Sequence, residues 1–180
     1  MADMTEYLAK VAAGIKEHLR LYIETDGREG YYRDMTHNPE GGDPKSLTLV
    51  IKTIGRKSGK AHLAPLLFNW WKDEAVIVGS KGGSDQPPAW FLNLSAAQTV
   101  DVQIRNKRYR CSWRVAEGAE REKIWRFMAD YYPPYGTYQA RTERQLPVVL
   151  LAPGEEIAER FVVTDDDGVD ATMNKAITGA

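Results

Sequence analysis

The spacing of apolar positions along the chain predicts one long helix followed by a series of short strands. Between residues 5 and 23 the apolar side chains recur every three or four positions, which is the period of an amphipathic helix. Glycines and prolines interrupt every period across residues 26–45, so this segment predicts a long loop. Short apolar and β-branched runs then follow at 47–54, 61–71, 75–80, 99–104, 109–115 and 146–151.

Three shorter helical segments are predicted among these strands, at 88–97, 118–132 and 138–144. Pro88 suits a first helical turn, and Pro133-Pro134 would end the second of these helices. Tight turns connect most of the strands, whereas a parallel sheet needs a crossover helix between them. The pattern therefore predicts a mainly β fold with flanking helices, in which an antiparallel barrel carries helices across its openings.

The length of 180 residues and the hydrophobic content of 43% are enough for one sizeable core. We divide the chain into an N-terminal helix and loop (1–46), a barrel (47–153) and an acidic C-terminal extension (154–180).

Charge limits the kind of partner that we expect. The 24 basic and 25 acidic residues nearly cancel, which argues against nucleic acid or an anionic membrane as the main partner. Residues 153–180 contain seven acids and two cations, so this end carries a net charge of −5 and residues 1–152 carry +4. A mildly basic body suits a small anionic ligand better than a polymer.

Cys111 is the only cysteine, which excludes an intrachain disulfide and a thiolate metal cluster. The three histidines lie in unrelated contexts, so we expect no metal site. The N-terminal residues lack the pattern of a signal peptide, and no apolar run is long enough to span a bilayer. These features predict a cytoplasmic protein.

A cationic turn between the first two predicted strands is the first candidate for binding chemistry. Gly55 and Gly59 bracket Arg56, Lys57 and Ser58, and glycine permits backbone conformations in which both side chains and amide groups face a ligand. The turn is therefore a place to hold an anion. A solvated hairpin tip is the alternative, because exposed turns are often charged and rich in glycine.

A second glycine-containing loop follows the third predicted strand. It consists of Ser80-Lys81-Gly82-Gly83, and a helix is predicted to begin soon afterwards near Pro88. In a barrel this loop and the cationic turn can lie at one rim, where cations, glycine amides and a helix start would converge on a phosphate or polycarboxylate.

Four tyrosines surround Pro133-Pro134 near the end of the predicted helix 118–132, namely Tyr131, Tyr132, Tyr135 and Tyr138. Phenol rings can stack on a flat heterocycle, and their hydroxyls can donate a hydrogen bond or a proton to a reacting carbonyl. A packed helix end is the alternative for this cluster.

These motifs together resemble the deazaflavin-dependent nitroreductase family. The residues that carry the resemblance are Thr53-Ile54-Gly55-Arg56-Lys57-Ser58-Gly59-Lys60, Pro65-Leu66, Gly79-Ser80-Lys81-Gly82-Gly83, Pro88-Ala89-Trp90 with Asn93, Tyr132-Pro133-Pro134-Tyr135, Tyr138-Gln139-Ala140-Arg141-Thr142 and Pro147-Val148-Val149. The resemblance runs from about Leu47 to Pro153. The longer polar segment 26–46 and the acidic tail after Pro153 are departures from it.

The resemblance implies a split antiparallel β-barrel of the FMN-binding and pyridoxamine-phosphate-oxidase-like type. It also implies that the barrel binds coenzyme F-420, an 8-hydroxy-5-deazaflavin with a phospholactyl-oligoglutamate tail. Arg56, Lys57 and Lys81 would hold the phosphate and the tail. The full set of cofactor contacts implied in this way is Arg56, Lys57, Ser58, Pro65, Leu66, Gly79, Ser80, Lys81, Gly82, Gly83, Trp90 and Asn93.

The implied function is that of an oxidoreductase, in which reduced F-420 passes a hydride to an electron-poor acceptor such as an enone, quinone or nitroaromatic. Tyr132, Tyr135 and Tyr138 would form the wall over this substrate, and Tyr132, Tyr135 or Ser80 would stabilise charge or supply the proton. An FMN-dependent reductase and a non-catalytic carrier of a flavin, deazaflavin or haem remain as alternatives. A homodimer is left open, as is peripheral membrane proximity if the acceptor is a quinone.

Overall fold

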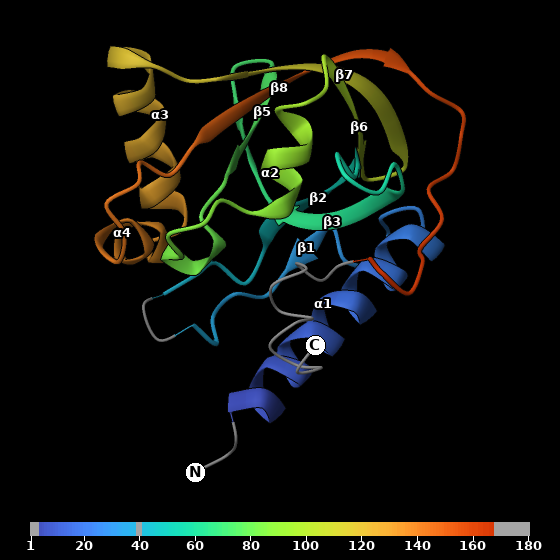
Figure 1. The fold of residues 1–180 in the computed structure, drawn as a ribbon, viewed down its shortest axis with the longest axis horizontal. Coiled ribbons are helices and arrows are strands. Elements are labelled where there is room, and N and C mark those ends of the chain that lie inside the picture. Colours follow the sequence, from blue (N-terminus) through green and yellow to red (C-terminus); the bar gives the residue numbers. More distant parts are fainter. Residues whose placement is uncertain (1–3, 39–40, 168–180) are drawn as a thin grey trace.

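A curled antiparallel sheet forms the centre of the molecule, with helices against its outside and across its openings (Figure 1). The computed structural model describes residues 4–38 and 41–167. Its helices are α1 (Met4–Glu24), the short 3-10 helix η1 (Lys81–Gly83), α2 (Ala89–Leu94), α3 (Gly118–Tyr131) and α4 (Pro134–Ala140). Its strands are β1 (Tyr32–Arg33), β2 (Ser46–Ile54), β3 (Ala61–Leu67), β4 (Asn69–Trp71), β5 (Glu74–Val78), β6 (Thr99–Ile104), β7 (Lys107–Val115) and β8 (Val148–Glu156).

All strand pairings in the described residues are antiparallel. The strands follow the order β1-β2-β6-β7-β8-β5-β4, and β3 pairs with β2 off this path. Pro65 therefore lies in an edge strand, as predicted, because it has no N–H to give to a ladder. The mainly β fold with flanking helices is confirmed, and so is its split-barrel architecture.

The strands bury both of their faces. In β5, Ala75 and Ile77 belong to one apolar cluster, while Val76 and Val78 belong to another, since successive side chains point to opposite faces of a sheet. The first cluster includes Leu19 and Tyr22 of α1. The second fills the space between the sheet and the helices α3 and α4. The sheet is therefore covered on both sides, which gives the site below a rigid support.

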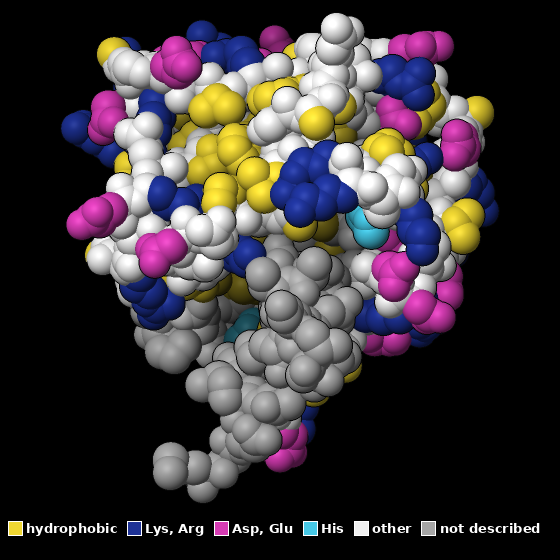
Figure 2. Space-filling view, viewed as in Figure 1, with side chains coloured by type: hydrophobic (Ala, Val, Ile, Leu, Met, Phe, Trp, Pro, Cys, Tyr) yellow, Lys and Arg dark blue, Asp and Glu magenta, His cyan; other side chains and the backbone are white. Residues whose placement is uncertain are grey.

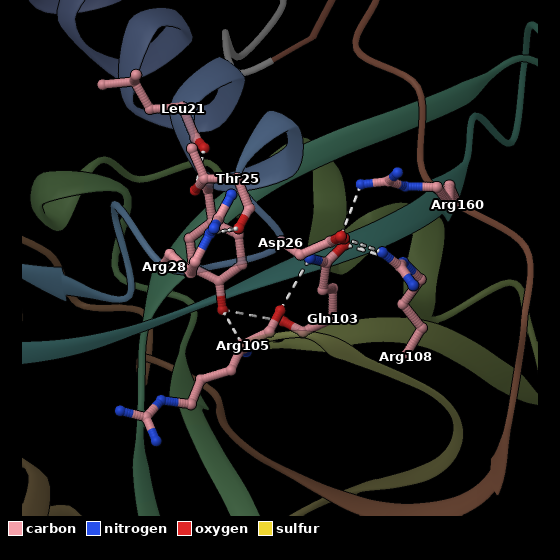
Figure 3. Close-up of polar contacts among 9 residues, drawn as sticks. Leu21, Thr25, Asp26, Arg28, Gln103, Arg105, Arg108 and Arg160 are labelled. Carbon is pink, nitrogen blue, oxygen red and sulfur yellow. Dashed lines mark hydrogen bonds and ion pairs between the residues drawn. The ribbon is translucent and has the colours of Figure 1, made fainter.

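Polar contacts attach helix α1 and the residues just after it to the barrel, including the β6–β7 hairpin (Figure 3). The Tyr22 hydroxyl accepts a hydrogen bond from the Arg105 amide (2.9 Å) and donates one to the Thr48 carbonyl (3.0 Å). Asp26 pairs with Arg108 of β7 and, at 2.7 Å, with Arg160 of the C-terminal segment. These contacts join the N-terminal helix, the barrel and the chain that follows β8.

The segment 157–167 packs on the barrel after β8 ends. Phe161 is 3% exposed and belongs to the first apolar cluster. Asp167 is 1% exposed, and its carboxylate accepts hydrogen bonds from the amides of Leu63 (2.7 Å) and Thr164 (2.6 Å). The acidic extension is thus part of the folded molecule as far as Asp167. Its remaining residues lie outside the described part of the chain.

Several element boundaries differ from the predicted ones. The predicted strand 61–71 is two strands, because the chain turns inward at Phe68, which is fully buried and donates its amide to the Leu47 carbonyl (3.0 Å). The last strand begins at Val148 and runs to Glu156, beyond the predicted 146–151. The predicted loops also contain β1 and η1, two or three residues each, which are too short to show a period.

The prolines after α3 have a second role that the sequence analysis missed. Pro133-Pro134 ends α3 as predicted, but Pro134 also begins α4, where a helical turn had been predicted only from 138. Proline is favoured in a first helical turn, since its missing N–H would have no helical partner there. None of the described helices is both long and apolar enough to cross a membrane.

Candidate functional site

The cationic turn is an ordered loop at the tip of the β2–β3 hairpin. The Gly55 amide donates to the Lys60 carbonyl (2.8 Å), and the Gly59 amide donates to the Gly55 carbonyl (2.7 Å). Arg56, Lys57 and Ser58 are exposed between them. The Ser58 hydroxyl accepts a hydrogen bond from the Lys60 amide (3.3 Å), so Ser58 shapes the turn. The backbone closes on itself and leaves two cations facing solvent.

Asn93 connects this turn to α2. Its side-chain oxygen accepts from the Arg56 amide (3.2 Å) and the Arg56 guanidinium (3.4 Å), while its Nδ2 donates to the Thr53 hydroxyl (3.4 Å). Asn93 is 7% exposed. A buried amide with these contacts holds Arg56 in place.

The loop after β5 has an unusual backbone. Lys81, Gly82 and Gly83 have φ angles of 45°, 62° and 81° in succession. A Cβ atom at Gly83 would lie 2.3 Å from the Tyr138 carbonyl oxygen of α4, whereas one at Gly82 would meet nothing within 4 Å. Gly83 therefore lets the loop approach α4, and Gly82 presents open backbone on the other side.

Arg144 holds this loop from the chain that follows α4. Its guanidinium donates to the carbonyls of Ser84 (2.6 Å, from Nε), Gly79 (3.1 Å, from Nη1) and Ser80 (2.8 Å, from Nη2). No sequence motif points to Arg144, which is one arginine in a polar stretch. Only the strand order brings it to the end of β5.

The three predicted tyrosines do come together. The ring centres of Tyr132 and Tyr135 lie 5.0 Å apart, and each lies 6.4 Å from that of Tyr138. Tyr132 and Tyr135 are each 4% exposed, and Tyr138 is half-buried. The Tyr132 hydroxyl accepts a hydrogen bond from Asn38 Nδ2 (2.9 Å), a contact that no sequence motif indicated. The three rings therefore form a packed cluster at the end of α3 and in α4.

Burial sets the protonation of these phenols. It raises the pKa of Tyr135 and, together with the neighbouring Tyr138 hydroxyl, that of Tyr132 above the ordinary range of a phenol. Both groups therefore stay neutral at physiological pH and keep a proton to donate. Cys111 is buried and its pKa is raised to about 12 by burial, which leaves it an unreactive thiol.

Helix α2 connects the cationic turn to the loop Ser80-Lys81-Gly82-Gly83, called the glycine loop below. Its start lies beside Gly79, where a Cβ would be 3.7 Å from Pro88, and its end holds the turn through Asn93. Trp90 is half-buried against the first apolar cluster. Pro65 and Leu66 are half-buried in β3, opposite Val50 and Leu49 of β2. The end of α2 thus contacts the cationic turn, and its start lies beside Gly79.

The face that carries these elements suits a ligand with a flat apolar part and an anionic part. Figure 2 shows hydrophobic side chains gathered between α3 and α2, with lysine and arginine side chains at the border. Two hollows adjoin the site. One of about 530 Å³ is lined by Asp85, Ala140, Arg141, Thr142, Glu143 and Arg144, and one of about 270 Å³ is lined in part by Thr53, Ile54 and Asn93.

This donor set fits coenzyme F-420, whose deazaflavin is flat and whose tail carries a phosphate and carboxylates. Arg56 and Lys57 are exposed cations of the kind that an anionic tail requires, and a Cβ at Gly82 would meet nothing within 4 Å. The fold and site are those of a split β-barrel that can hold a ligand of this kind.

Comparison with known proteins gives the family. The model of the F420H(2)-dependent quinone reductase family, named after the reduced form of coenzyme F-420, matches residues 15–153. The chain therefore belongs to this family and is an oxidoreductase whose cofactor is coenzyme F-420. This finding confirms the resemblance drawn from the motifs and favours F-420 over the FMN alternative. The matched range begins at residue 15 and therefore includes segment 26–46.

Individual relatives agree. An F420H(2)-dependent quinone reductase of Mycobacterium tuberculosis is 29% identical over 140 residues, which cover 76% of this chain and 88% of that protein. A solved F420-H2 dependent reductase is 37% identical with a TM-score of 0.53, covering 58% of this chain and 92% of that one. A solved structure described as a domain-swapped dimer is 32% identical with a TM-score of 0.56, covering 76% of this chain and 94% of that one.

Proposed function

We propose that this protein reduces a quinone at the expense of reduced coenzyme F-420. The observation that carries the proposal is the bridge made by α2, which joins the cationic turn at Asn93 to the glycine loop beside Gly79. When bound in its reduced form, F-420 supplies a hydride equivalent. The protein supplies binding, orientation and exclusion of water.

Arg56 and Lys57 are proposed to hold the phosphate and the tail carboxylates, with Lys81 on the glycine loop as a third cation. Arg56 is the best placed, because its amide and guanidinium are both tied to buried Asn93. Charge-assisted hydrogen bonds contribute about 1.5–3 kcal/mol each, so a few of them are enough for micromolar affinity after the costs of association. Ser58 and Gly59 keep the turn in shape.

The deazaflavin is proposed to lie along Pro65, Leu66, Gly79 and Ser80, with Trp90 and Asn93 bracing the pocket and Gly82 and Gly83 bounding it. Gly79 is buried, and a Cβ there would lie 2.6 Å from the Pro147 ring. Because of this close packing, the base (floor) of the proposed pocket is formed by the backbone of Gly79 and Ser80 and is held rigidly. A floor of this kind keeps a flat ring in one orientation toward an acceptor.

Tyr132, Tyr135 and Tyr138 are proposed to form the wall against the quinone. Reduction of a quinone to a hydroquinone adds a hydride and a proton, and negative charge develops on the carbonyl oxygen before that proton arrives. The hydroxyls of Tyr132, Tyr135 and Ser80 are the candidates to stabilise this charge or to donate the proton. The raised pKa values of Tyr132 and Tyr135 keep these donors protonated.

A homodimer is part of the same proposal. The support is that a solved structure 32% identical to this chain is described as a domain-swapped dimer. Size-exclusion chromatography with light scattering would show a mass near twice that of the 20.3 kDa chain, and a monomeric mass would contradict it.

Fluorescence titration tests the cofactor step, and a turnover assay tests the acceptor. We expect F-420 fluorescence to be quenched with a Kd below about 50 µM, whereas FMN should not bind in that range. Reduced F-420 should then be consumed in the presence of menadione, a soluble naphthoquinone. Absence of quenching would contradict the binding site. Binding without turnover across several quinones, enones and nitroaromatics would favour the carrier alternative.

A further inference from the structure

The guanidinium of Arg144 is committed to the backbone of a single loop. Its three nitrogens donate to the carbonyls of Gly79, Ser80 and Ser84, at 3.1, 2.8 and 2.6 Å. An arginine beside a phosphate site would ordinarily be expected to contact the anion. Here all three guanidinium nitrogens of Arg144 donate to carbonyl oxygens instead, at both ends of η1. Arg144 therefore acts on the shape of the loop.

This loop needs outside support to keep its shape. Three successive residues, Lys81, Gly82 and Gly83, have positive φ, and Lys81 has a side chain that makes this conformation unfavourable. Such a backbone persists where surrounding contacts determine it. Arg144 supplies contacts on both sides of the strained residues, because Gly79 and Ser80 precede them and Ser84 follows.

The chain between α4 and Arg144 adds further contacts to the same loop. The Thr142 hydroxyl donates to Asp85 (2.8 Å), and the Arg141 guanidinium donates to the Gly82 carbonyl (3.4 Å). Arg144 is itself held, because its carbonyl accepts a hydrogen bond from Gln139 of α4 (2.9 Å). Tyr138 lies on the same helix and its carbonyl abuts Gly83. These contacts therefore hold the loop Ser80-Lys81-Gly82-Gly83 and helix α4 together, and Arg144 contacts both.

We propose that Arg144 is a positioning residue for the coenzyme site: it holds Gly79, Ser80 and Ser84 in the conformation that receives the deazaflavin, and it couples this loop to α4. This inference rests on the proposed function, since it assumes that Gly79 and Ser80 line the coenzyme. Lysine cannot replace the arginine, because an ammonium on a flexible stem cannot present a planar fork to carbonyls on two sides of a turn.

The experiment measures F-420 binding to Arg144→Ala and Arg144→Lys by fluorescence, with Arg126→Ala as the matched control. Arg126 is an exposed arginine of α3, so its removal changes the net charge equally. We expect both Arg144 variants to bind F-420 at least about tenfold more weakly than the wild type, and the control to bind normally. Hydrogen exchange of residues 79–85 should accelerate in the Arg144 variants alone.

Rescue by free guanidinium separates positioning from a general loss of structure. The hollow of about 530 Å³ lined by Arg144 opens a path to the vacated position in Arg144→Ala. Millimolar guanidinium, far below denaturing concentrations, should restore part of the coenzyme affinity of Arg144→Ala, while the same concentration of ammonium should not. The wild type and Arg126→Ala should show no gain.

The outcomes are distinct from those that test the function itself. If the wild type does not bind F-420, the proposed function fails. If the wild type binds and Arg144→Ala or Arg144→Lys binds equally well, the positioning role of Arg144 is wrong. If Arg144→Ala does not fold, Arg144→Lys decides the question, because a folded Arg144→Lys protein with wild-type affinity and unchanged exchange at 79–85 also overturns it.

Discussion

The side-chain oxygen of Asn93 accepts hydrogen bonds from both the backbone amide and the guanidinium of Arg56, at 3.2 and 3.4 Å. One buried amide thereby fixes the cation that the proposed function places on the coenzyme tail. It also connects a turn of the sheet to a helix that begins beside the glycine loop.

Replacing Asn93 by alanine should therefore weaken both the fold and the coenzyme site. The change leaves the Arg56 amide and the Thr53 hydroxyl without their partner, which costs about 1–3 kcal/mol of unfolding free energy. We expect the Kd for F-420 to rise several-fold in the fluorescence titration. Asn106→Ala, at an exposed position in the β6–β7 turn, is the control and should change neither value. Wild-type affinity in Asn93→Ala would show that Asn93 does not brace the site.

Removing both exposed cations of the turn should change how binding depends on salt. In the double variant Arg56→Ala/Lys57→Ala we expect roughly tenfold weaker F-420 binding at low ionic strength and a flatter decline as salt is added, since fewer screened charges remain. The double variant Lys123→Ala/Arg126→Ala removes two exposed cations of α3 and is the matched control. A deazaflavin without the phosphate and tail should bind all three proteins alike. If the salt dependence of the first variant equals that of the wild type, the turn does not hold the tail.

Phenylalanine at the tyrosine wall should alter turnover more than coenzyme binding. Tyr132→Phe and Tyr138→Phe each remove one hydroxyl and keep the ring packing. We expect quinone turnover to fall about tenfold or more in at least one of them, with Kd for F-420 within about twofold of the wild type. Tyr131→Phe is the control, because the Tyr131 hydroxyl accepts the Leu47 amide at 2.5 Å and should affect stability instead. Unchanged turnover in both variants would assign the wall a packing role only.

The C-terminal segment should contribute to stability through Asp167. Its buried carboxylate accepts hydrogen bonds from the amides of Leu63 and Thr164 and from the Thr164 hydroxyl, so Asp167→Ala leaves the buried Leu63 amide without its partner. We expect a loss of about 2–3 kcal/mol in urea unfolding. Asp166→Ala should change stability by less than about 1 kcal/mol, because Asp166 faces Lys60 in an exposed pair at 4.0 Å. Equal effects of the two substitutions would mean that the segment is held by something other than the Asp167 carboxylate.

His18 should make the fold sensitive to mild acid. Burial lowers the pKa of His18 and outweighs the hydrogen bond to the Gly30 carbonyl, which raises it, and the nearby Arg33 lowers it further. The Nδ1 atom of His18 is buried without a hydrogen-bond partner among the described residues. Unfolded His18 binds a proton below its ordinary pKa of about 6.5, while folded His18 stays neutral to lower pH, so stability should fall as the pH drops through about 6.5. Urea unfolding at pH 7.5 and 5.5 measures this loss. His18→Gln should reduce the difference, and an unchanged difference would assign the acid sensitivity to other groups.

Much of the fold could be predicted from the sequence, because several elements depend on local patterns of side chains. The apolar period of 5–23 specified α1, the alternation in β6 specified a strand, and the continuous apolar run in β5 specified a buried strand, because a side chain's direction follows from backbone geometry within a few residues. The cationic turn was also predictable, since two glycines and a charged tip between two apolar runs indicate a hairpin by themselves. The start of α4 at Pro134 was missed because the same proline pair both ends one helix and begins the next.

Contacts between distant residues were decided by the tertiary structure alone. Asn93 lies 37 positions from Arg56, and Arg144 lies 64 positions from Ser80. A sequence pattern that repeats every few residues cannot predict contacts across such separations. The pairing of β8 with β5 carries Arg144 to the glycine loop, and the packing of α2 carries Asn93 to the turn. Sequence by itself determined which residues had the chemistry to hold an anion and a flat ring. The closure of the barrel determined which of them meet, because only long-range strand pairing fixes positions across so many residues.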